Sequence, residues 1–198
     1  MATKFPYVLF ERYADDIVVH CKSEAQAKYI LVQIAARLGE WKLELHPEKT
    51  HIVYCKDSNR TGNHAHEEFD FLSFTFRARR ARSKDGHLFR GFLPAMSRKA
   101  KKKKSNEIRE WKLQVRTDLS INELAEVCNA AVRGWHNYYG MFYRSEFLKV
   151  LRPINFKLLK WTKRKYRKNT RSAWAWLQGI CRRQPDLFAH WKFGLAIA

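Results

Sequence analysis

Near residue 95 the sequence changes from one repeating pattern to another, and this change limits the folds that the chain can adopt. Before this point, short apolar runs alternate with polar turns, a pattern typical of β-strands. From Ser97 onward, apolar residues recur at helical spacing. The sequence therefore predicts an α+β fold, with antiparallel strands and one packed helix over residues 1–95 and an all-helical region over residues 96–198.

Positive charge follows a similar division. Residues 1–75 contain 9 Lys and Arg against 11 Asp and Glu, whereas residues 76–198 contain 30 against 8. The formal net charge of +20 points to an anionic partner, of which nucleic acid and an acidic membrane surface are the usual examples. No apolar run approaches the ~20 residues that a membrane span needs, so nucleic acid is the expected partner.

In the first part, the apolar runs predict short strands and one helix. The helix is expected to begin after Ser23, which forms a capping box with Gln26, and to end at Gly39. Asp85-Gly86 predicts the turn of a basic hairpin that Pro94 ends. The strands are expected at Tyr7–Glu11, Ile17–Cys21, Ile52–Cys55, Phe69–Phe76, Arg77–Arg82 and Leu88–Leu93.

In the second part, Ser120 and Glu123 form another capping box that predicts the start of a helix. Pro153 is expected to kink or restart a long basic helix. The segment from Gly134 to Gly140 is aromatic, and its rings are expected to pack between helices rather than to stack on bases. The helices are expected at about 98–116, 121–133, 146–166 and 171–183.

Asp15 and Asp16 stand in a polar turn between the first two expected strands. Two adjacent carboxylates repel each other unless a cation lies between them or solvent screens them. Hard oxygen ligands of this kind suit Mg²⁺, and paired Mg²⁺ ions drive phosphoryl transfer in polymerases. An Asp-Asp turn is more often simply solvated, so the residues alone leave both alternatives open.

Five segments, in order along the chain, resemble motifs of the group II intron reverse transcriptase/maturase family. The first surrounds the two acids, the next two resemble the following palm motif and the primer grip, and the last two resemble the maturase-domain motif and a tail of bacterial members. Each motif alone is weak, but their common order argues against chance similarity. The segments are Phe10–Asp16, Leu43–Thr50, Phe69–Phe74, Arg133–Tyr139 and Gln184–Trp191.

The resemblance implies a partial reverse-transcriptase palm followed by a helical thumb and maturase domain. It implies that Asp15 and Asp16 bind catalytic Mg²⁺ and that Lys49 lies near the phosphates of the incoming nucleotide. For the primer grip, the residues alone are equally compatible with an ordinary core. The implied primer-grip residues are Phe71, Leu72 and Phe74.

Two dense blocks of Lys and Arg lie in the expected helices, and we predict that they bind nucleic-acid phosphates. Basic helices suit RNA, because A-form RNA is recognised mainly through shape, phosphates and 2′-hydroxyl groups. The lysines of such a block are expected to be largely interchangeable. The predicted contacts are Arg98, Lys99, Lys101, Lys102, Lys103, Lys104, Lys160, Lys163, Arg164 and Lys165.

The chain also departs from the family pattern. The family usually has Gly where Lys42 and Ser73 stand, and we expect the fingers and the first palm motif, with its metal-binding Asp, to be missing. Three hypotheses follow. The chain is a fragment that binds intron RNA and template-primer without polymerising, or it completes a polymerase with a separately encoded N-terminal half, or it is a basic splicing factor without an enzymatic role. The resemblance implies a bacterial, cytoplasmic protein associated with nucleic acid.

Overall fold

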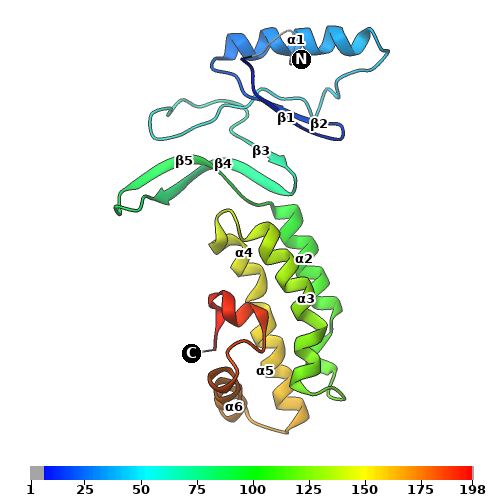
Figure 1. Cartoon of the computed structure of the whole chain (residues 1–198), viewed down its shortest axis with the longest axis vertical. Coiled ribbons are helices and arrows are strands. Elements are labelled where there is room, and N and C mark those ends of the chain that lie inside the picture. Colours follow the sequence, from blue (N-terminus) through cyan, green and yellow to red (C-terminus); the bar gives the residue numbers. More distant parts are fainter. Residues whose placement is uncertain (1–6, 198) are drawn as a thin grey trace. The chain divides into compact units, whose positions relative to one another are not determined.

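The computed structural model describes residues 7–197, which form two compact units (Figure 1). The first unit comprises residues 7–71 and 77–92, and the second comprises residues 72–76 and 93–197. Strands and one long helix make up the first unit, whereas helices dominate the second, so the predicted α+β class is confirmed. We refer to them as the strand unit and the helical unit.

A short hairpin begins the strand unit. Strand β1 (Phe10–Tyr13) pairs antiparallel with β2 (Asp16–Val19), and the facing strand ends leave only Ala14 and Asp15 in the turn. Ala14 has a φ of 52°, which matches the positive first φ of a type II′ hairpin turn. Both strands are therefore shifted toward the turn relative to the predicted strands at Tyr7–Glu11 and Ile17–Cys21.

The predicted cap of helix α1 (Glu24–Gly39) is confirmed. The Ser23 hydroxyl accepts a hydrogen bond from Gln26 N at 3.2 Å. The side chain of Gln26 reaches back to Lys22 N at 2.7 Å, one residue earlier than in the predicted capping box. Ile30 is the buried anchor of this helix, at 2% exposed.

The C-terminal end of α1 explains one departure from the family pattern. Leu43 N donates to Leu38 O at 3.0 Å and Lys42 N donates to Gly39 O at 3.0 Å, which is the arrangement of a Schellman motif. In this motif the residue after the cap is left-handed, and Lys42 has a φ of 58°. Gly39 ends the helix as predicted, but Lys42 occupies the position that favours glycine.

The strand predicted at Ile52–Cys55 does not form. A strand needs a neighbour with a matching row of backbone groups, and here side-chain contacts organise the loop instead. The backbone bond from Tyr54 N to His66 O, at 2.9 Å, is accompanied by an ion pair between Lys56 and Glu67 at 3.4 Å. His66 also stacks on His51, with ring centroids 4.3 Å apart.

A second sheet has the strand order β3 (Glu68–Phe71), β4 (Phe74–Arg82) and β5 (Leu88–Met96). The prediction of one strand over Phe69–Phe76 is therefore wrong. Leu72 and Ser73 have φ values of 48° and 67°, and together they form a two-residue turn with two left-handed residues. Such a turn usually contains Asn or Gly, and neither residue is present here, so the local sequence does not predict the turn.

The second hairpin forms as predicted, but it does not end at Pro94. Gly86 has a φ of 87° in the turn, and Ser83 N donates to His87 O at 2.9 Å where the strands begin. Strand β5 continues through Pro94 to Met96. This is possible because β5 is an edge strand of the sheet, where a missing backbone donor costs no ladder bond.

The helical unit contains five α-helices and two short helical turns among the described residues. Their bounds are α2 (Arg98–Glu110), η1 (Leu113–Val115), α3 (Ile121–Tyr139), α4 (Arg144–Leu151), α5 (Pro153–Lys165), α6 (Thr170–Arg183) and η2 (Trp191–Leu195).

Two of these helices have other bounds than predicted. Helix α2 ends earlier, because Lys112 is left-handed with a φ of 49° and the chain then tightens into η1. Helix α3 runs on to Tyr139, because an isolated glycine such as Gly134 weakens a helix by only about 1 kcal/mol, less than its buried aromatic neighbours contribute. Pro153 separates α4 from α5 and occupies the first position of α5, as the restart alternative predicted.

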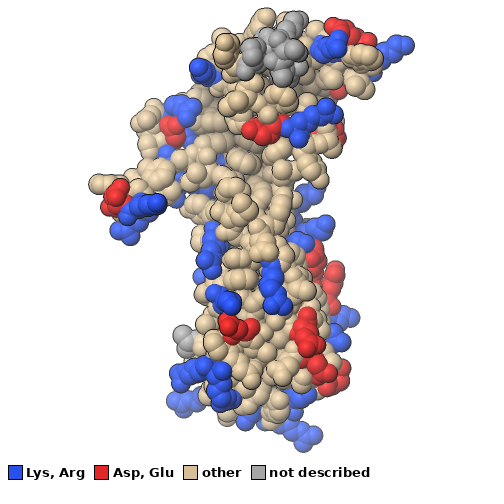
Figure 2. Space-filling view, viewed as in Figure 1, with Lys and Arg blue, Asp and Glu red and all other residues tan. Residues whose placement is uncertain are grey.

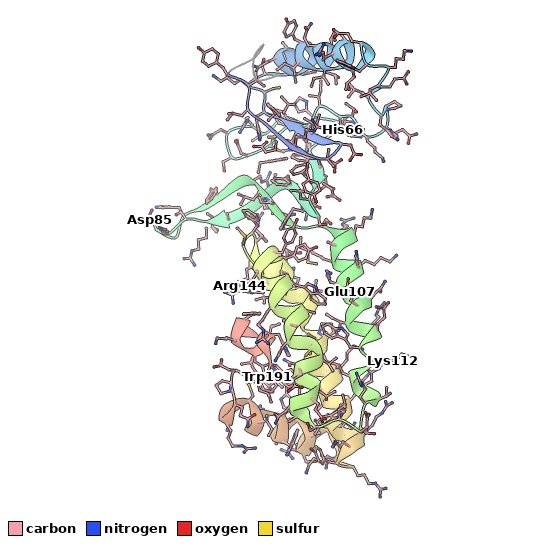
Figure 3. The ribbon with its side chains drawn as sticks, turned by 45° about the vertical axis from the view of Figure 1, so that its right-hand side comes forward. His66, Asp85, Glu107, Lys112, Arg144 and Trp191 are labelled. Atoms are coloured by element: carbon pink, nitrogen blue, oxygen red, sulfur yellow. The ribbon has the colours of Figure 1, made fainter. Side chains whose placement is uncertain are left out.

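The buried Asn129 and the half-buried Asn155 hold the C-terminal segment against the helices. Asn129 on α3 donates to Leu187 O and accepts from Ala189 N, both at 2.8 Å. Asn155 on α5 donates to Leu195 O at 2.9 Å. Trp191, which lies inside the unit in Figure 3, is 2% exposed. These bonds satisfy an irregular buried backbone that no regular element could pair.

His190 is buried in the same segment with its tautomer fixed. The Asn155 oxygen accepts from Trp191 Nε1 at 2.9 Å, so the His190 Nε2 that lies 2.8 Å from that oxygen must carry a hydrogen. Nδ1 is then a bare acceptor, and it has no hydrogen-bond partner among residues 7–197. Burial lowers the pKa of His190 to about 3.

The left-handed turn yields a stability prediction. Replacing Ser73 by Gly should stabilise the protein by about 1 kcal/mol, because Gly removes the steric cost of a positive φ. Urea or thermal unfolding measures the gain. Ser73→Ala is the matched control and should not stabilise, because Ala keeps the clash. An equal gain in both variants would refute the conformational explanation.

His190 yields a prediction on pH dependence. Its pKa is depressed in the folded state, so stability is complete above the ordinary pKa of 6.5 and falls as pH decreases toward about 3. Between pH 8 and pH 5 the loss should be about 2 kcal/mol, since each pH unit corresponds to ~1.4 kcal/mol. His190→Gln keeps a donor for Asn155 and should abolish this part of the dependence. An unchanged slope in the variant would contradict the assignment.

Candidate active site and nucleic-acid interface

The two predicted catalytic acids lie at the β1–β2 turn. Asp15 is in the turn itself and Asp16 is the first residue of β2, and both are exposed. Arg12 Nε donates to Ala14 O at 2.8 Å, and this local hydrogen bond stabilises the turn. The two carboxylates are therefore presented together to solvent at one tip of a tight hairpin, as the sequence predicted.

Lys49 is not brought into contact with these acids. It lies in an exposed turn in which Lys49 N donates to His46 O at 3.2 Å. Within residues 7–197, no hydrogen bond or ion pair joins Lys49 to Asp15 or Asp16. No group of three or more His, Cys, Asp and Glu in this part of the chain could hold a metal ion. The role of these residues in Mg²⁺ and nucleotide binding stays a prediction.

The predicted primer-grip residues divide between surface and core. Leu72 is 37% exposed in the left-handed turn, whereas Phe74 is 6% exposed. Phe71, the last residue of β3, is half-buried. The turn is fixed from the helical unit: Tyr138 donates its hydroxyl hydrogen to Leu72 O at 2.8 Å, and Ser97 N donates to Ser73 O at 2.9 Å.

An aromatic cluster that the sequence did not predict holds Phe74 in place. The rings of Tyr138, Tyr139 and Phe142 lie 5.3–5.6 Å from the ring of Phe74, centroid to centroid. These distances suit offset and edge-to-face contacts. The expected packing role of the aromatic segment is confirmed for Trp135, which is 8% exposed and stacks on Trp111 at 5.4 Å.

Helix α2 exposes a basic face. Arg98, Lys99, Lys102 and Lys103 are exposed, and the i, i+4 spacing places them on one side of the helix. Ala100 and Ile108 are buried on the opposite side. Within residues 7–197, these four cations have no ion-pair partner. They keep their full charge available for an anion.

The other two lysines of this block are engaged within the protein. Lys101 forms an ion pair with Glu146 of α4, and Lys101 together with Lys149 lowers the pKa of Glu146 to about 2. Lys104 pairs with Glu107 at 2.9 Å and lies 4.9 Å from the centroid of the Trp135 ring. These side chains stabilise the helical unit, so the six cations of the block are not interchangeable as the sequence suggested.

Helix α5 divides its cations in the same way. Arg164 donates to Gln114 O at 3.0 Å, and Lys165 donates to Thr117 O at 3.0 Å and Leu119 O at 2.6 Å. These carbonyls belong to the irregular segment that joins α2 to α3. Lys165 thus has a structural role, and Arg164 has one guanidinium nitrogen engaged.

Lys160 and Lys163 complete an exposed basic face on α5. Lys163 Nζ donates to Thr170 Oγ1 at 2.8 Å, a neutral contact that leaves its charge uncompensated. Phe156 lies one turn before Lys160 on this face and is 61% exposed. An exposed aromatic ring therefore lies on the same face of α5 as Lys160 and Lys163.

Helix α5 packs against η1. Burial and the positive charges of Lys160 and Arg109 lower the pKa of Lys157. Lys157 donates to Gln114 Oε1 at 3.2 Å. Figure 2 shows that acidic patches interrupt the basic surface of the helical unit, so the positive charge is grouped rather than uniform.

Comparison with known families gives two matches. Residues 2–76 match the family described as reverse transcriptase (RNA-dependent DNA polymerase). Residues 101–178 match the group II intron, maturase-specific domain. No curated protein and no solved structure gives a significant match. None of the helices within residues 7–197 is long and apolar enough to cross a membrane.

A reverse-transcriptase segment followed by a maturase-specific domain defines a class of intron-encoded protein. The acidic hairpin lies within the first match, and the basic faces of α2 and α5 lie largely within the second. The chain belongs to the group II intron reverse transcriptase/maturase family, and the resemblance predicted from its five motifs is confirmed.

The distinction between exposed cations and cations that are hydrogen-bonded within the protein yields a prediction, because the two kinds of variant should affect different measurements. Lys102→Gln combined with Lys103→Gln should weaken RNA binding and reduce the slope of log K against log salt by about 0.7–0.9 for each phosphate that is no longer bound, without changing stability. Lys165→Gln should instead destabilise the protein by about 1–3 kcal/mol, because it leaves two carbonyls without their charged donor.

Fluorescence anisotropy across a KCl series measures the first effect, and urea unfolding measures the second. If Lys165→Gln weakened binding as much as the double variant and left unfolding unchanged, the assignment of structural and binding lysines would be wrong.

Proposed function

We propose that the helical unit binds intron RNA and template-primer through the exposed basic faces of α2 and α5. The observation that carries this proposal is that the cations exposed on α2, and Lys160 on α5, have no ion-pair partner within residues 7–197. Helices presenting such cations suit the phosphates and 2′-hydroxyl groups of A-form RNA. The match of residues 101–178 to the maturase-specific domain supports the choice of intron RNA.

We further propose that the chain does not extend a primer by itself. Asp15 and Asp16 supply hard oxygen ligands suited to Mg²⁺, but no third acid, His or Cys within residues 7–197 is placed to join them. Paired metal ions in phosphoryl transfer need further oxygen ligands to hold their geometry. Lys49, which has no contact with the two acids, is proposed to reach nucleotide phosphates only when the rest of a palm is assembled around the hairpin.

A second candidate function is that of one half of a split polymerase. Apolar side chains on the hairpin and beside α1 are exposed, with Tyr13 at 62%, Ile17 at 44% and Trp41 at 68%. Among residues 7–197 the β1–β2 sheet has two strands, so no third strand pairs with either outer edge. An N-terminal half that supplies fingers and a further palm acid would cover such a surface.

Primer extension on an RNA template with Mg²⁺ tests these proposals together with RNA binding. The isolated chain should bind template-primer in a salt-sensitive way and add no nucleotides. Addition of a separately produced polypeptide carrying fingers and the first palm acid should restore extension if the chain is one half of a split polymerase. Asp15→Ala combined with Asp16→Ala should then abolish that extension and leave RNA binding unchanged.

Each alternative has its own outcome. Extension by the isolated chain that disappears in the Asp15→Ala/Asp16→Ala variant would overturn the proposal that the chain is inactive alone. Splicing of a group II intron that proceeds equally well with this variant, with no extension under any condition, would favour a splicing factor without an enzymatic role. Absence of salt-sensitive RNA binding by the unchanged chain would refute the primary proposal.

A further inference from the structure

An aromatic ring on helix α5 lies opposite the side of the helix that packs into the protein. Ile154, Leu158 and Trp161 are each 0% exposed, whereas Phe156 is 61% exposed and is the most exposed phenylalanine within residues 7–197. With about 3.6 residues per turn, its position falls on the far side of α5 from these buried residues. The ring of Phe156 therefore adds little to the packing of the helix.

Cations flank this ring along the helix. Lys160 lies one turn after Phe156, and Arg152 lies one turn before it with helical backbone angles, φ −49° and ψ −40°. Both cations are exposed, and neither has an ion-pair partner within residues 7–197. Residues four apart lie on the same side of a helix, so the exposed face has the order cation, ring, cation.

The ring of Phe156 is not engaged by another ring or by a cation of the described chain. Trp161, Tyr166 and Trp176 contact one another through their rings, and Lys165 lies over Trp161, but no such contact within residues 7–197 involves Phe156. An exposed ring without these contacts has face area left for a ligand.

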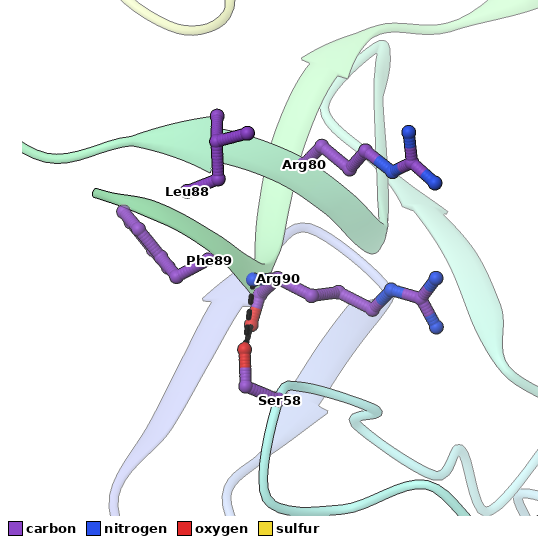
Figure 4. A pocket seen from close by; sticks show the side chains of 5 residues that line it. All are labelled: Ser58, Arg80, Leu88, Phe89 and Arg90. Carbon is purple, nitrogen blue, oxygen red and sulfur yellow. Dashed lines mark hydrogen bonds between the residues drawn. The ribbon is translucent and has the colours of Figure 1, made fainter. Parts of the chain in front are cut away.

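The β4–β5 hairpin also has an aromatic residue among cations, but strand geometry separates them. Phe89 and Arg90 are adjacent in β5, so their side chains extend to opposite sides, as Figure 4 shows. Arg80, which lines the same hollow of about 210 Å³, has an interaction of its own within the protein. The ring and the cations of the hairpin therefore do not share one face, as those of α5 do.

The ligand that fits the exposed face of α5 is an anion with a flat apolar group. A nucleotide of a single strand has both parts, because its phosphates bind cations and its unpaired base stacks on an aromatic ring. Arg152 and Lys160 are two helical turns apart, about 12 Å along the axis, so their long side chains approach the ring from both ends. A second copy of this face would place cations against cations, which disfavours self-association.

We propose that Phe156 stacks on an unpaired base of the RNA that the helical unit binds, while Arg152 and Lys160 bind the phosphates on either side of that base. The inference rests on the RNA binding proposed for α2 and α5, and it specifies which part of the RNA reaches α5. That part is an unpaired nucleotide in a loop, a bulge or a single strand. Base-paired RNA, whose bases are stacked inside, would contact the cations without the ring.

Photo-crosslinking of the full chain locates the contact. The probe is a short oligouridylate with one central 5-iodouridine, a base that crosslinks to aromatic rings in contact with it, and mass spectrometry maps the product. A crosslink to Phe156 is expected. An oligouridylate that binds the chain and gives no crosslink within residues 152–163 would overturn the proposal.

Fluorescence anisotropy with the same oligouridylate across a KCl series separates stacking from charge. Phe156→Leu should weaken binding about fivefold or more, the lower end for one base stack, without changing the slope of log K against log salt. Arg152→Gln combined with Lys160→Gln should instead reduce that slope by about 0.7 for each phosphate no longer bound. Phe156→Tyr keeps the ring and should bind within about twofold of the unchanged chain.

Two controls distinguish the ring from general apolar surface. Met141, which is 73% exposed, lies in the same unit but outside α5, and Met141→Ala should leave oligouridylate binding unchanged. Phe156→Leu should leave the binding of duplex RNA unchanged, because a duplex offers no free base. Urea unfolding of every variant verifies that it is folded.

Several results would refute the stacking role of Phe156. These are equal oligouridylate affinity of Phe156→Leu and the unchanged chain, an equal loss on duplex RNA, and a loss in Phe156→Tyr as large as in Phe156→Leu. Self-association that disappears in Phe156→Leu, with oligouridylate binding unchanged, would make the face a contact between copies. Absence of salt-sensitive binding by the unchanged chain would instead refute the helical RNA interface itself, so the two failures are distinguishable.

Discussion

The helical unit depends on the contact between α5 and the irregular segment that joins α2 to α3. That segment pairs only some of its carbonyl groups internally, and α5 supplies donors to Gln114 O, Arg116 O, Thr117 O and Leu119 O. Trp161 Nε1 donates to Arg116 O at 2.8 Å while its ring, 0% exposed, fills the interior beneath. Arg164 and Lys165 serve the neighbouring carbonyls. One helix thus supplies both apolar packing and hydrogen-bond donors to a segment that regular structure leaves partly unpaired.

The same contact also determines which cations of α5 remain available to bind an anion. Lys165 Nζ donates to Thr117 O and Leu119 O, so this cation is engaged within the protein and is less available to a phosphate. Lys160, which lies more than one turn earlier on the same helix, is exposed. Within one basic block of α5, some positions therefore stabilise the fold and others remain available to bind an anion. The position of each residue around the helix decides which role it has.

The sequence predicted those features that depend on neighbouring residues. The caps at Ser23, Ser97 and Ser120 are local hydrogen bonds between residues three apart, and they are where the pattern placed the helix starts. The acidic hairpin was predicted for the same reason, since apolar runs flank a short polar turn. Helical periodicity, with Pro153 at the restart of α5, likewise predicted the all-helical second part.

Features that depend on distant partners were not predictable in this way. The separation of free from engaged lysines rests on carbonyls more than 40 residues away along the chain. The β3–β4 turn was not predicted because Leu72 and Ser73 have no preference for a positive φ, and the contacts that hold them come from Tyr138 and Ser97. The structure also explains why the family usually has Gly where Lys42 and Ser73 stand: both residues have the positive φ that glycine favours.

The tight turn between β3 and β4 has a consequence for how the chain tolerates changes in length. Side chains alternate between the faces of a strand, so a single residue inserted between Phe71 and Phe74 would present Phe74 to the opposite face of the sheet. The ring would leave its place among Tyr138, Tyr139 and Phe142, and a polar neighbour would enter it. Loops elsewhere in the strand unit can lengthen at small entropic cost, whereas this two-residue connection acts as a fixed spacer.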